Sequence, residues 1–151
     1  MKHEEQHIFS GDAAERIPNA GPVDLEKLRA FFTADRFAMD AGITLDEAEP
    51  GRAVCSMIIQ PRHLNAGNTV QGGAIFTLAD FAFAAAANAG QPLTVSLSNQ
   101  VTFLKPAKGG RLIAEAVCIS GGKRTCFYRV TVTDDLGTNV AEMTVNGYIK
   151  R

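Results

Sequence analysis

The spacing of hydrophobic residues changes along this 151-residue chain, and each change marks a new element. Apolar residues between Asp24 and Phe32 recur at helical spacing, and Asp24 is suited to cap a short helix there. After Gly42, two extended segments flank a Pro-Gly turn dipeptide, which predicts a hairpin with strands over 43–49 and 52–60. An Asn- and Gly-rich loop follows the hairpin.

The segment from Gln71 to Ala89 is the most apolar stretch of the chain and is rich in helix formers. After its first residue, its only polar side chains are those of Thr77, Asp80 and Asn88. At about 1.5 Å per residue, such a helix is on the order of 27 Å long. A helix that is apolar on all sides is typically buried, so we expect this one to cross the middle of the domain.

Four further extended segments complete the chain, separated by short turns that contain Pro and Gly or Asp and Gly. Strands joined by such turns are usually antiparallel neighbours. The predicted fold is therefore an α+β domain over 23–151, in which a curved antiparallel sheet wraps around one long helix. The mixed, Pro-containing residues 1–22 indicate a flexible N-terminal extension. The expected strands cover 94–104, 111–120, 125–133 and 138–148.

The composition of the chain argues against several classes of function. Fifteen Lys and Arg against sixteen Asp and Glu leave a formal net charge of -1. A pI near 6.3, with no aromatic residues interleaved among the basic ones, argues against nucleic-acid binding. Three cysteines outside any C-x-x-C pair favour a reducing, cytoplasmic location, and no segment predicts a signal peptide or a membrane anchor. No His, Cys and Asp set has metal-ligand spacing, so we expect no metal site.

The distribution of charge singles out one acid. Asp80 is the only acidic residue between Glu49 and Glu115, and no basic residue lies on its predicted helix. An unpaired carboxylate among apolar residues is costly, and apolar surroundings raise its pKa. Asp80 is therefore either a helix-face residue that meets a partner's arginine or an exposed groove, or else a general base or nucleophile. We favour the catalytic interpretation.

Gln71, Gly72 and Gly73 begin this helix. Free backbone N–H groups and the positive end of the macrodipole at a helix start suit a carbonyl oxygen that becomes an oxyanion. Alternatively, the two glycines only turn the chain into the helix. Gly72 and Asp80 are eight residues apart, about 12 Å along the axis, so one carbonyl does not easily reach both in one chain. A two-fold dimer that pairs Asp80 with the partner's Gly72 would solve this.

Other candidates lie in the flanking turns. His63 and Asn65 precede the helix, but a lone loop histidine is more often structural, and Asn65 could be a turn residue. Basic residues flank two later turns and are either ordinary solvated residues or a phosphate-contacting rim for a nucleotide-bearing ligand. These basic residues are Lys105, Lys108, Lys123 and Arg124.

Three blocks of the chain carry a family resemblance. They are HLNAGNTVQGGAIFTLADFAFAAAANAG, LTVSLSNQVTFLKPAKGG and GGKRTCFYRVTVTDDLGTNVAEM, and the likeness covers about residues 37–149. The order and spacing of these blocks resemble those of the hotdog-fold acyl-CoA thioesterases of the phenylacetate-degradation (PaaI-like) type. The resemblance implies hydrolysis of an acyl- or aryl-acyl-CoA thioester and a homodimer or dimer of dimers. It implies no cofactor, because coenzyme A is part of the substrate.

The same resemblance implies roles for single residues. Asp80 matches the catalytic acid, and Gly72 matches the glycine whose N–H polarises the thioester carbonyl. Asn65 matches an asparagine that helps to place the attacking water or the thioester. Ser96 matches a serine that in some relatives orients this water together with the carboxylate. Family dimers supply the Asn and Gly from one chain and the acid from the other.

The chain departs from the family pattern at Gln71, where relatives usually have His before two glycines. Gln cannot titrate, but the expected carbonyl contact comes from the Gly72 backbone, so we expect hydrolysis with an altered substrate preference. Gln71, Gly73 and His63 are expected to contact the substrate. A non-catalytic acyl-CoA sensor on the same fold is the main alternative. A hotdog dehydratase would need a histidine beside a carboxylate, and no His follows His63.

Overall fold

The protein is represented by a computed structural model that describes residues 21–150. The expected N-terminal extension, residues 1–22, lies outside the described residues except for its last two. Of these two, Gly21 donates its backbone N–H to the carbonyl of Gly90 at 2.7 Å. The described chain therefore enters the domain beside the end of the long helix.

Six antiparallel strands form one sheet in the spatial order β1-β2-β4-β5-β6-β3. The strands are β1 (Ile43–Glu49), β2 (Arg52–Ile58), β3 (Thr94–Phe103), β4 (Arg111–Gly121), β5 (Thr125–Asp134) and β6 (Asn139–Ile149). The helices are α1 (Leu25–Phe32), α2 (Arg36–Ala41) and α3 (Gly72–Asn88), with the short 3₁₀ helix η2 (Pro61–His63) before α3.

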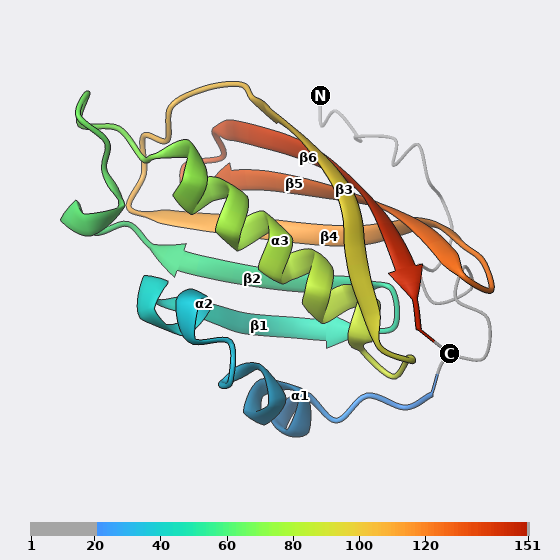
Figure 1. The fold of residues 1–151 in the computed structure, drawn as a ribbon. Coiled ribbons are helices and arrows are strands. Elements are labelled where there is room, and N and C mark those ends of the chain that lie inside the picture. Colours follow the sequence, from blue (N-terminus) through green and yellow to red (C-terminus); the bar gives the residue numbers. More distant parts are fainter. Residues whose placement is uncertain (1–20, 151) are drawn as a thin grey trace, which may run out of the picture.

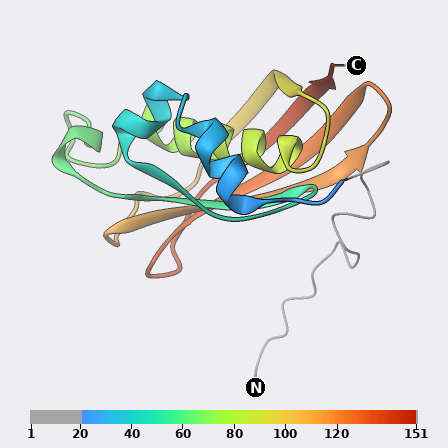
Figure 2. The same cartoon turned by 90° about the horizontal axis from the view of Figure 1, so that it is seen from below.

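The 17-residue α3 lies across the curved sheet (Figure 1), and α1 and α2 cover the same face of that sheet as α3 (Figure 2). The core lies between this helix and the alternating inward residues of the strands, as in the edge-on pair Phe83 and Tyr128, whose ring centroids are 5.1 Å apart. The predicted α+β architecture, with a sheet wrapped around one long helix, is therefore confirmed.

β3 is an edge strand, and its position corrects one prediction. The short connections predict that β3 and β4 are neighbours, but β3 pairs with β6 and lies three strands away from β4. Three strand spacings amount to about 14 Å, whereas the seven residues 104–110 between these strands can span about 23 Å. The connection is therefore long enough to cross the end of the sheet. The other expected neighbours, β1 with β2, β4 with β5 and β5 with β6, are confirmed.

The helix α2 is absent from the sequence prediction. Its start is capped by Asp35, whose side chain accepts the N–H of Ala38 at 3.1 Å, and it ends at Gly42 with φ of 83°. Both are standard helix-end signals. With only six residues, the helix is too short to establish a helical period in the sequence.

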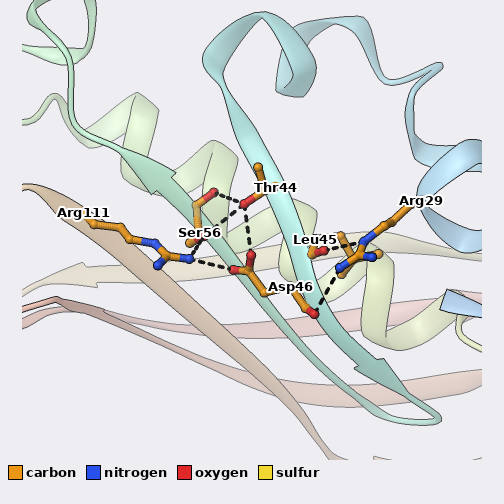
Figure 3. Close-up of polar contacts among 6 residues, drawn as sticks. All are labelled: Arg29, Thr44, Leu45, Asp46, Ser56 and Arg111. Atoms are coloured by element: carbon orange, nitrogen blue, oxygen red, sulfur yellow. Dashed lines mark hydrogen bonds and ion pairs between the residues drawn. The ribbon is translucent and has the colours of Figure 1, made fainter. Parts of the chain in front are cut away.

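Polar contacts attach α1 and the start of β4 to the first hairpin (Figure 3). Arg29 of α1 donates its Nε–H to the carbonyl of Leu45 at 2.9 Å. On the next strands, Arg111 donates to Ser56 Oγ at 2.6 Å and to Asp46 Oδ2 at 3.4 Å. The Arg29 bond holds α1 against β1, beside α3, and the Arg111 bonds hold the start of β4 to the hairpin.

Candidate active site

Asp80 lies midway along α3 and is half-buried. The two other polar side chains of the helix have partners: the Thr77 hydroxyl donates to a carbonyl one turn earlier at 2.7 Å, and Asn88 Nδ2 donates to the carbonyls of Ala84 and Thr94. Asp80 makes no hydrogen bond or ion pair with any residue of the described chain. An unpaired, half-buried carboxylate is costly, which makes Asp80 a candidate for a functional residue.

The surroundings of Asp80 make it a stronger base. Burial raises the pKa of its carboxyl above the ordinary value, and the negative charge of Asp35 raises it further. Asp35 is the N-cap of α2, and Phe32 of α1 packs edge-on against Phe81 with ring centroids 5.1 Å apart. The two short helices thus supply both an apolar wall and a like charge beside Asp80.

One row of α3 residues runs along the edge strand. The row starts at Gly72, which contacts the Phe103 ring of β3, and ends at Asn88, which exchanges hydrogen bonds with the backbone of Thr94. Asp80 is its central residue and therefore faces the middle of β3. The prediction that α3 is buried on all sides is wrong for this row, because the edge strand covers it only in part. The half-buried row consists of Gly72, Phe76, Asp80, Ala84 and Asn88.

A β-bulge at Leu97 determines which β3 side chains face α3. Across the bulge, Ser96 lies opposite Gly147 of β6 and Asn99 lies opposite Val145. Directly paired residues share a face of the sheet. Both partners face the helix, since Val145 is fully buried and a Cβ on Gly147 would lie 3.0 Å from an α3 phenylalanine ring. Ser96 and Asn99 therefore both lie on the helix side of β3, the side that Asp80 faces.

The start of α3 exposes backbone donors. Gln71 is the N-cap, and its side chain makes no capping hydrogen bond. The N–H groups of Gly72 and Gly73 have no intrahelical acceptor at this position. A Cβ on Gly72 would lie 2.9 Å from Cζ of Phe103, whereas one on Gly73 would meet only the flexible end of the Gln71 side chain. Gly72 is therefore required by a close approach of β3.

His63 has a structural role. It is 5% exposed, and both ring nitrogens are engaged by the backbone: the N–H of Gln60 donates to Nδ1 at 3.0 Å, and Nε2–H donates to the carbonyl of Ala41 at 2.8 Å. The His63 carbonyl also accepts the N–H of Gln71 at 2.8 Å. These contacts hold the loop to α2 and position the start of α3, which favours the structural alternative over substrate contact.

Asn65 organises the exposed loop before α3. Its Oδ1 accepts the N–H of Gly67 at 2.9 Å and the N–H of Thr69 at 3.2 Å. The side-chain carbonyl is therefore committed to the loop, while Nδ2 has no acceptor among residues 21–150. This leaves the amide N–H groups to donate to a ligand at the start of α3.

The four basic candidates do not form one patch in a protomer. Lys105 and Lys108 precede β4, and Lys123 and Arg124 follow it. The eleven residues of this strand separate the two pairs by about 35 Å. The 104–110 connection lies at the same end of the molecule as the start of α3 (Figure 1). Only the first pair is therefore close to Gly72 of the same chain.

A buried acid fixes the 104–110 connection. Asp134 Oδ2 accepts the N–H groups of Lys108 at 2.8 Å and Gly109 at 2.9 Å, and Oδ1 accepts those of Leu136 and Thr138. Burial alone would raise the pKa of Asp134, but these N–H donors lower it well below its ordinary value. The carboxylate thereby holds the loop that carries two lysines.

Within the described residues, no group of three His, Cys, Asp or Glu side chains is arranged to hold a metal ion. In the same part of the chain, no helix has the length and hydropathy to cross a membrane.

Comparison with known proteins identifies the family. Residues 67–141 match the thioesterase superfamily. A protein of Archaeoglobus fulgidus, described as an esterase, is 36% identical over 96 residues, which cover 63% of this chain and 62% of that protein. Acyl-coenzyme A thioesterase PaaI of Escherichia coli is 31% identical, with 77% of this chain and 84% of PaaI covered. Human acyl-coenzyme A thioesterase 13 is 33% identical, with coverages of 72% and 81%. The chain belongs to the thioesterase superfamily and is a thioester hydrolase.

Solved structures agree with the fold. The E. coli PaaI structure superposes with a TM-score of 0.79 at 28% identity and covers 84% of this chain and 93% of that one. A Streptococcus mutans protein solved with bound acetyl-CoA gives 0.68 at 27% identity, with coverages of 72% and 88%. The hotdog fold expected from the sequence blocks is confirmed.

Two residues beside the site are not identified as site residues by the sequence pattern. Phe103, which packs on Gly72, is an ordinary strand residue in the sequence, and nothing in the pattern marks its contact. Asn99 did leave a signal, because it and Gln100 are amides in the middle of an expected strand. Only the bulge at Leu97 decides that Asn99, and not Gln100, turns toward α3.

Proposed function

We propose that this protein hydrolyses acyl-CoA thioesters and that Asp80 is the general base. The observation that carries the proposal is the unpaired, half-buried Asp80 carboxylate on a helix whose other polar side chains are satisfied. A base with a raised pKa takes a proton more readily at neutral pH, while its partial exposure admits water and substrate. The names of the E. coli and human relatives support an acyl-CoA as the substrate.

In this mechanism Asp80 removes a proton from a water molecule as the water oxygen bonds to the thioester carbonyl carbon. The carbonyl electron pair moves to its oxygen, which the N–H of Gly72 stabilises. When the tetrahedral intermediate collapses, the C–S bond breaks and the CoA sulfur takes the proton from Asp80. The products are a free acid and CoA, and the carboxylate is restored.

The site is shared between two subunits. Gly72 and Asp80 are separated by about 12 Å along one helix, whereas a reacting carbonyl must lie about 3 Å from its donors. A two-fold dimer brings Asp80 of one protomer beside Gly72 of its partner. Asn65, in the loop that leads into α3, then donates to the thioester on the side of Gly72.

The CoA phosphates are bound by Lys105 and Lys108. Both are exposed, and both lie on the connection at the Gly72 end of the molecule. Lysine ammonium groups are strongly attracted to phosphate, and the loop that carries them is held in place by Asp134.

Hydrolysis by the Asp80→Asn variant tests the general base. We expect kcat to fall by about 10²–10⁴-fold on acetyl-, long-chain and aromatic acyl-CoAs, measured as release of free thiol, while the isosteric variant remains folded. Near-wild-type hydrolysis by the folded variant contradicts the assignment. Tight binding of these acyl-CoAs by the wild-type protein without turnover would instead identify a sensor.

Subunit mixing tests the shared site. Proline is tolerated in the first turn of a helix, so Gly72→Pro removes the N–H donor, and Gly72→Ala controls for the added Cβ. When inactive Asp80→Asn and Gly72→Pro chains form a mixed dimer, one of its two sites contains both intact groups. Activity should therefore return in the mixture. No recovery in verified mixed dimers would place both groups in one chain.

A further inference from the structure

Asn99 of β3 has a buried carbonyl oxygen with no partner. Among the described residues, two buried side-chain oxygen or nitrogen atoms lack a hydrogen bond, Asn99 Oδ1 and the Tyr128 hydroxyl. An unsatisfied buried carbonyl is costly, so most such atoms bind protein groups or water. Tyr128 is enclosed in the core, whereas Asn99 lies on the edge strand beside α3.

Two contacts place Asn99 level with Asp80. At one end of β3, Thr94 is hydrogen-bonded to the last residue of α3, and at the other end Phe103 contacts the first residue of this helix. From Thr94 to Phe103, β3 has nine residue steps, and Asn99 lies five steps from Thr94. The same fraction of α3, counted from its C-terminal end, is about nine of its sixteen residue steps. That point is the level of Ala79 and Asp80.

A third contact gives the same alignment. Gly147 of β6 lies opposite Ser96, and a Cβ on it would meet the ring of Phe83 at 3.0 Å. Ser96 is therefore level with Phe83, one turn of α3 from Asp80. Asn99, two pairs further along β3, is about 7 Å nearer the start of α3, which again is close to Asp80.

We propose that Asn99 is a positioning residue for the attacking water, an inference that rests on the proposed function. The water donates one hydrogen to the Asp80 carboxylate and the other to Asn99 Oδ1. Its oxygen accepts the hydroxyl hydrogen of Ser96, which leaves one lone pair for the thioester carbon. Asn99 holds the water in this orientation, and it neither gains nor loses a proton during the reaction.

Asn99→Leu removes the acceptor at similar volume. We expect kcat to fall by about 10- to 100-fold, because misplacing a reacting group costs rate in this range, with KM changed less than about threefold. The thermal midpoint should stay the same or rise, since an apolar side chain replaces an unsatisfied buried carbonyl. Lower activity without lower stability is the mark of a functional polar group.

Asn99→Asp tests proximity to Asp80. A second carboxylate beside Asp80 raises the pKa of the pair, so the acidic limb of the kcat/KM profile should move to higher pH. Gln100 provides the matched control, because it is the next residue, is exposed and pairs with Thr144 on the other face of the strand. Gln100→Leu and Gln100→Glu should leave kcat and the acidic limb in place.

Two results overturn the inference. One is an Asn99→Leu variant with unchanged kcat and a lower thermal midpoint, which assigns the amide to structure. The other is an Asn99→Asp variant whose acidic limb does not move. Asp80→Asn measured in parallel separates the two proposals. If Asp80→Asn is inactive while Asn99→Leu is unaffected, only the role of Asn99 fails. If Asp80→Asn is active, the proposed function and this inference both fail.

Discussion

A single methyl group at Gly72 would disturb the proposed oxyanion contact without removing its N–H. In Gly72→Ala, the new Cβ would lie 2.9 Å from Cζ of Phe103 and 3.3 Å from Cε1 and Cε2. Comfortable contact between carbon atoms begins at about 3.5 Å, so the ring or the start of α3 must move by about 0.6 Å. The substitution keeps the Gly72 N–H group, and the part of this movement that the start of α3 takes up displaces the donor.

The two consequences of Gly72→Ala differ in size. Phe103 is 52% exposed and can swing outward, so the overpacking cost falls at the low end of the usual range, about 1 kcal/mol. Alanine returns up to about 1 kcal/mol through its higher helix propensity, so the free energy of unfolding should change by less than about 1 kcal/mol. A misplacement of about 1 Å can cost about 10² in rate, so we expect kcat to fall about tenfold.

Acyl-CoA hydrolysis and urea unfolding of Gly72→Ala, measured together, check this expectation. Gly73→Ala adds the same methyl group where it would meet only the flexible end of the Gln71 side chain, so the start of α3 need not move and the loss of kcat should be smaller. Phe103→Leu in the Gly72→Ala background removes the clash and should restore most of kcat. A Gly72→Ala enzyme with wild-type kcat refutes the reasoning, as does an equal loss in Gly73→Ala or a double variant that stays impaired.

Three further predictions follow from the charges. Asp80→Asn should raise the thermal midpoint at pH 7 but not at pH 3, because an acid whose folded pKa is raised destabilises the fold only once it ionises, above about 3.9. If the wild-type protein and the variant have equal midpoints at both pH 7 and pH 3, the raised pKa of Asp80 is contradicted. Asp134→Asn should lower the midpoint at pH 7. The difference should shrink below about pH 4, where the carboxyl group of the unfolded wild-type chain takes up a proton before the folded one does; a constant difference argues against a charge effect. Reversing the charge of Lys105 and Lys108 should raise KM for acyl-CoA about tenfold or more, but not KM for a short thioester that lacks the nucleotide. Charge reversal at the β4–β5 turn should change neither KM. The opposite result would assign phosphate binding to the β4–β5 turn.

Much of the fold followed from local pattern. Burial imposes a period on the residues of a helix or strand, so each local pattern predicts its own element. This holds for the apolar run from Gln71 to Ala89, for the Pro-Gly hairpin and for the later alternating segments. Family membership also followed from the order of these blocks. The short α2 did not, because six residues hold too few turns for a periodic signal.

The site was predicted unevenly for a related reason. Asp80 stood out because an unpaired acid in an apolar helix contradicts its local surroundings. His63 was a candidate substrate contact, and only the folded chain brings Gln60 and Ala41 onto its ring nitrogens. Asn99 and Gln100 stood out as amides within an expected strand, but only the bulge decides that Asn99 is the one that faces α3.

The sequence by itself determined the helices and strands other than the short α2. It also determined that one long apolar helix forms the centre of the domain and that Asp80 is chemically out of place there. These properties depend on neighbours within a few residues. The tertiary structure alone decided that β3 pairs with β6 at the edge of the sheet and that the bulge in β3 turns both Ser96 and Asn99 toward α3. These arrangements depend on which distant segments pair and in what register, and a shift of one residue in that register turns every side chain to the opposite face.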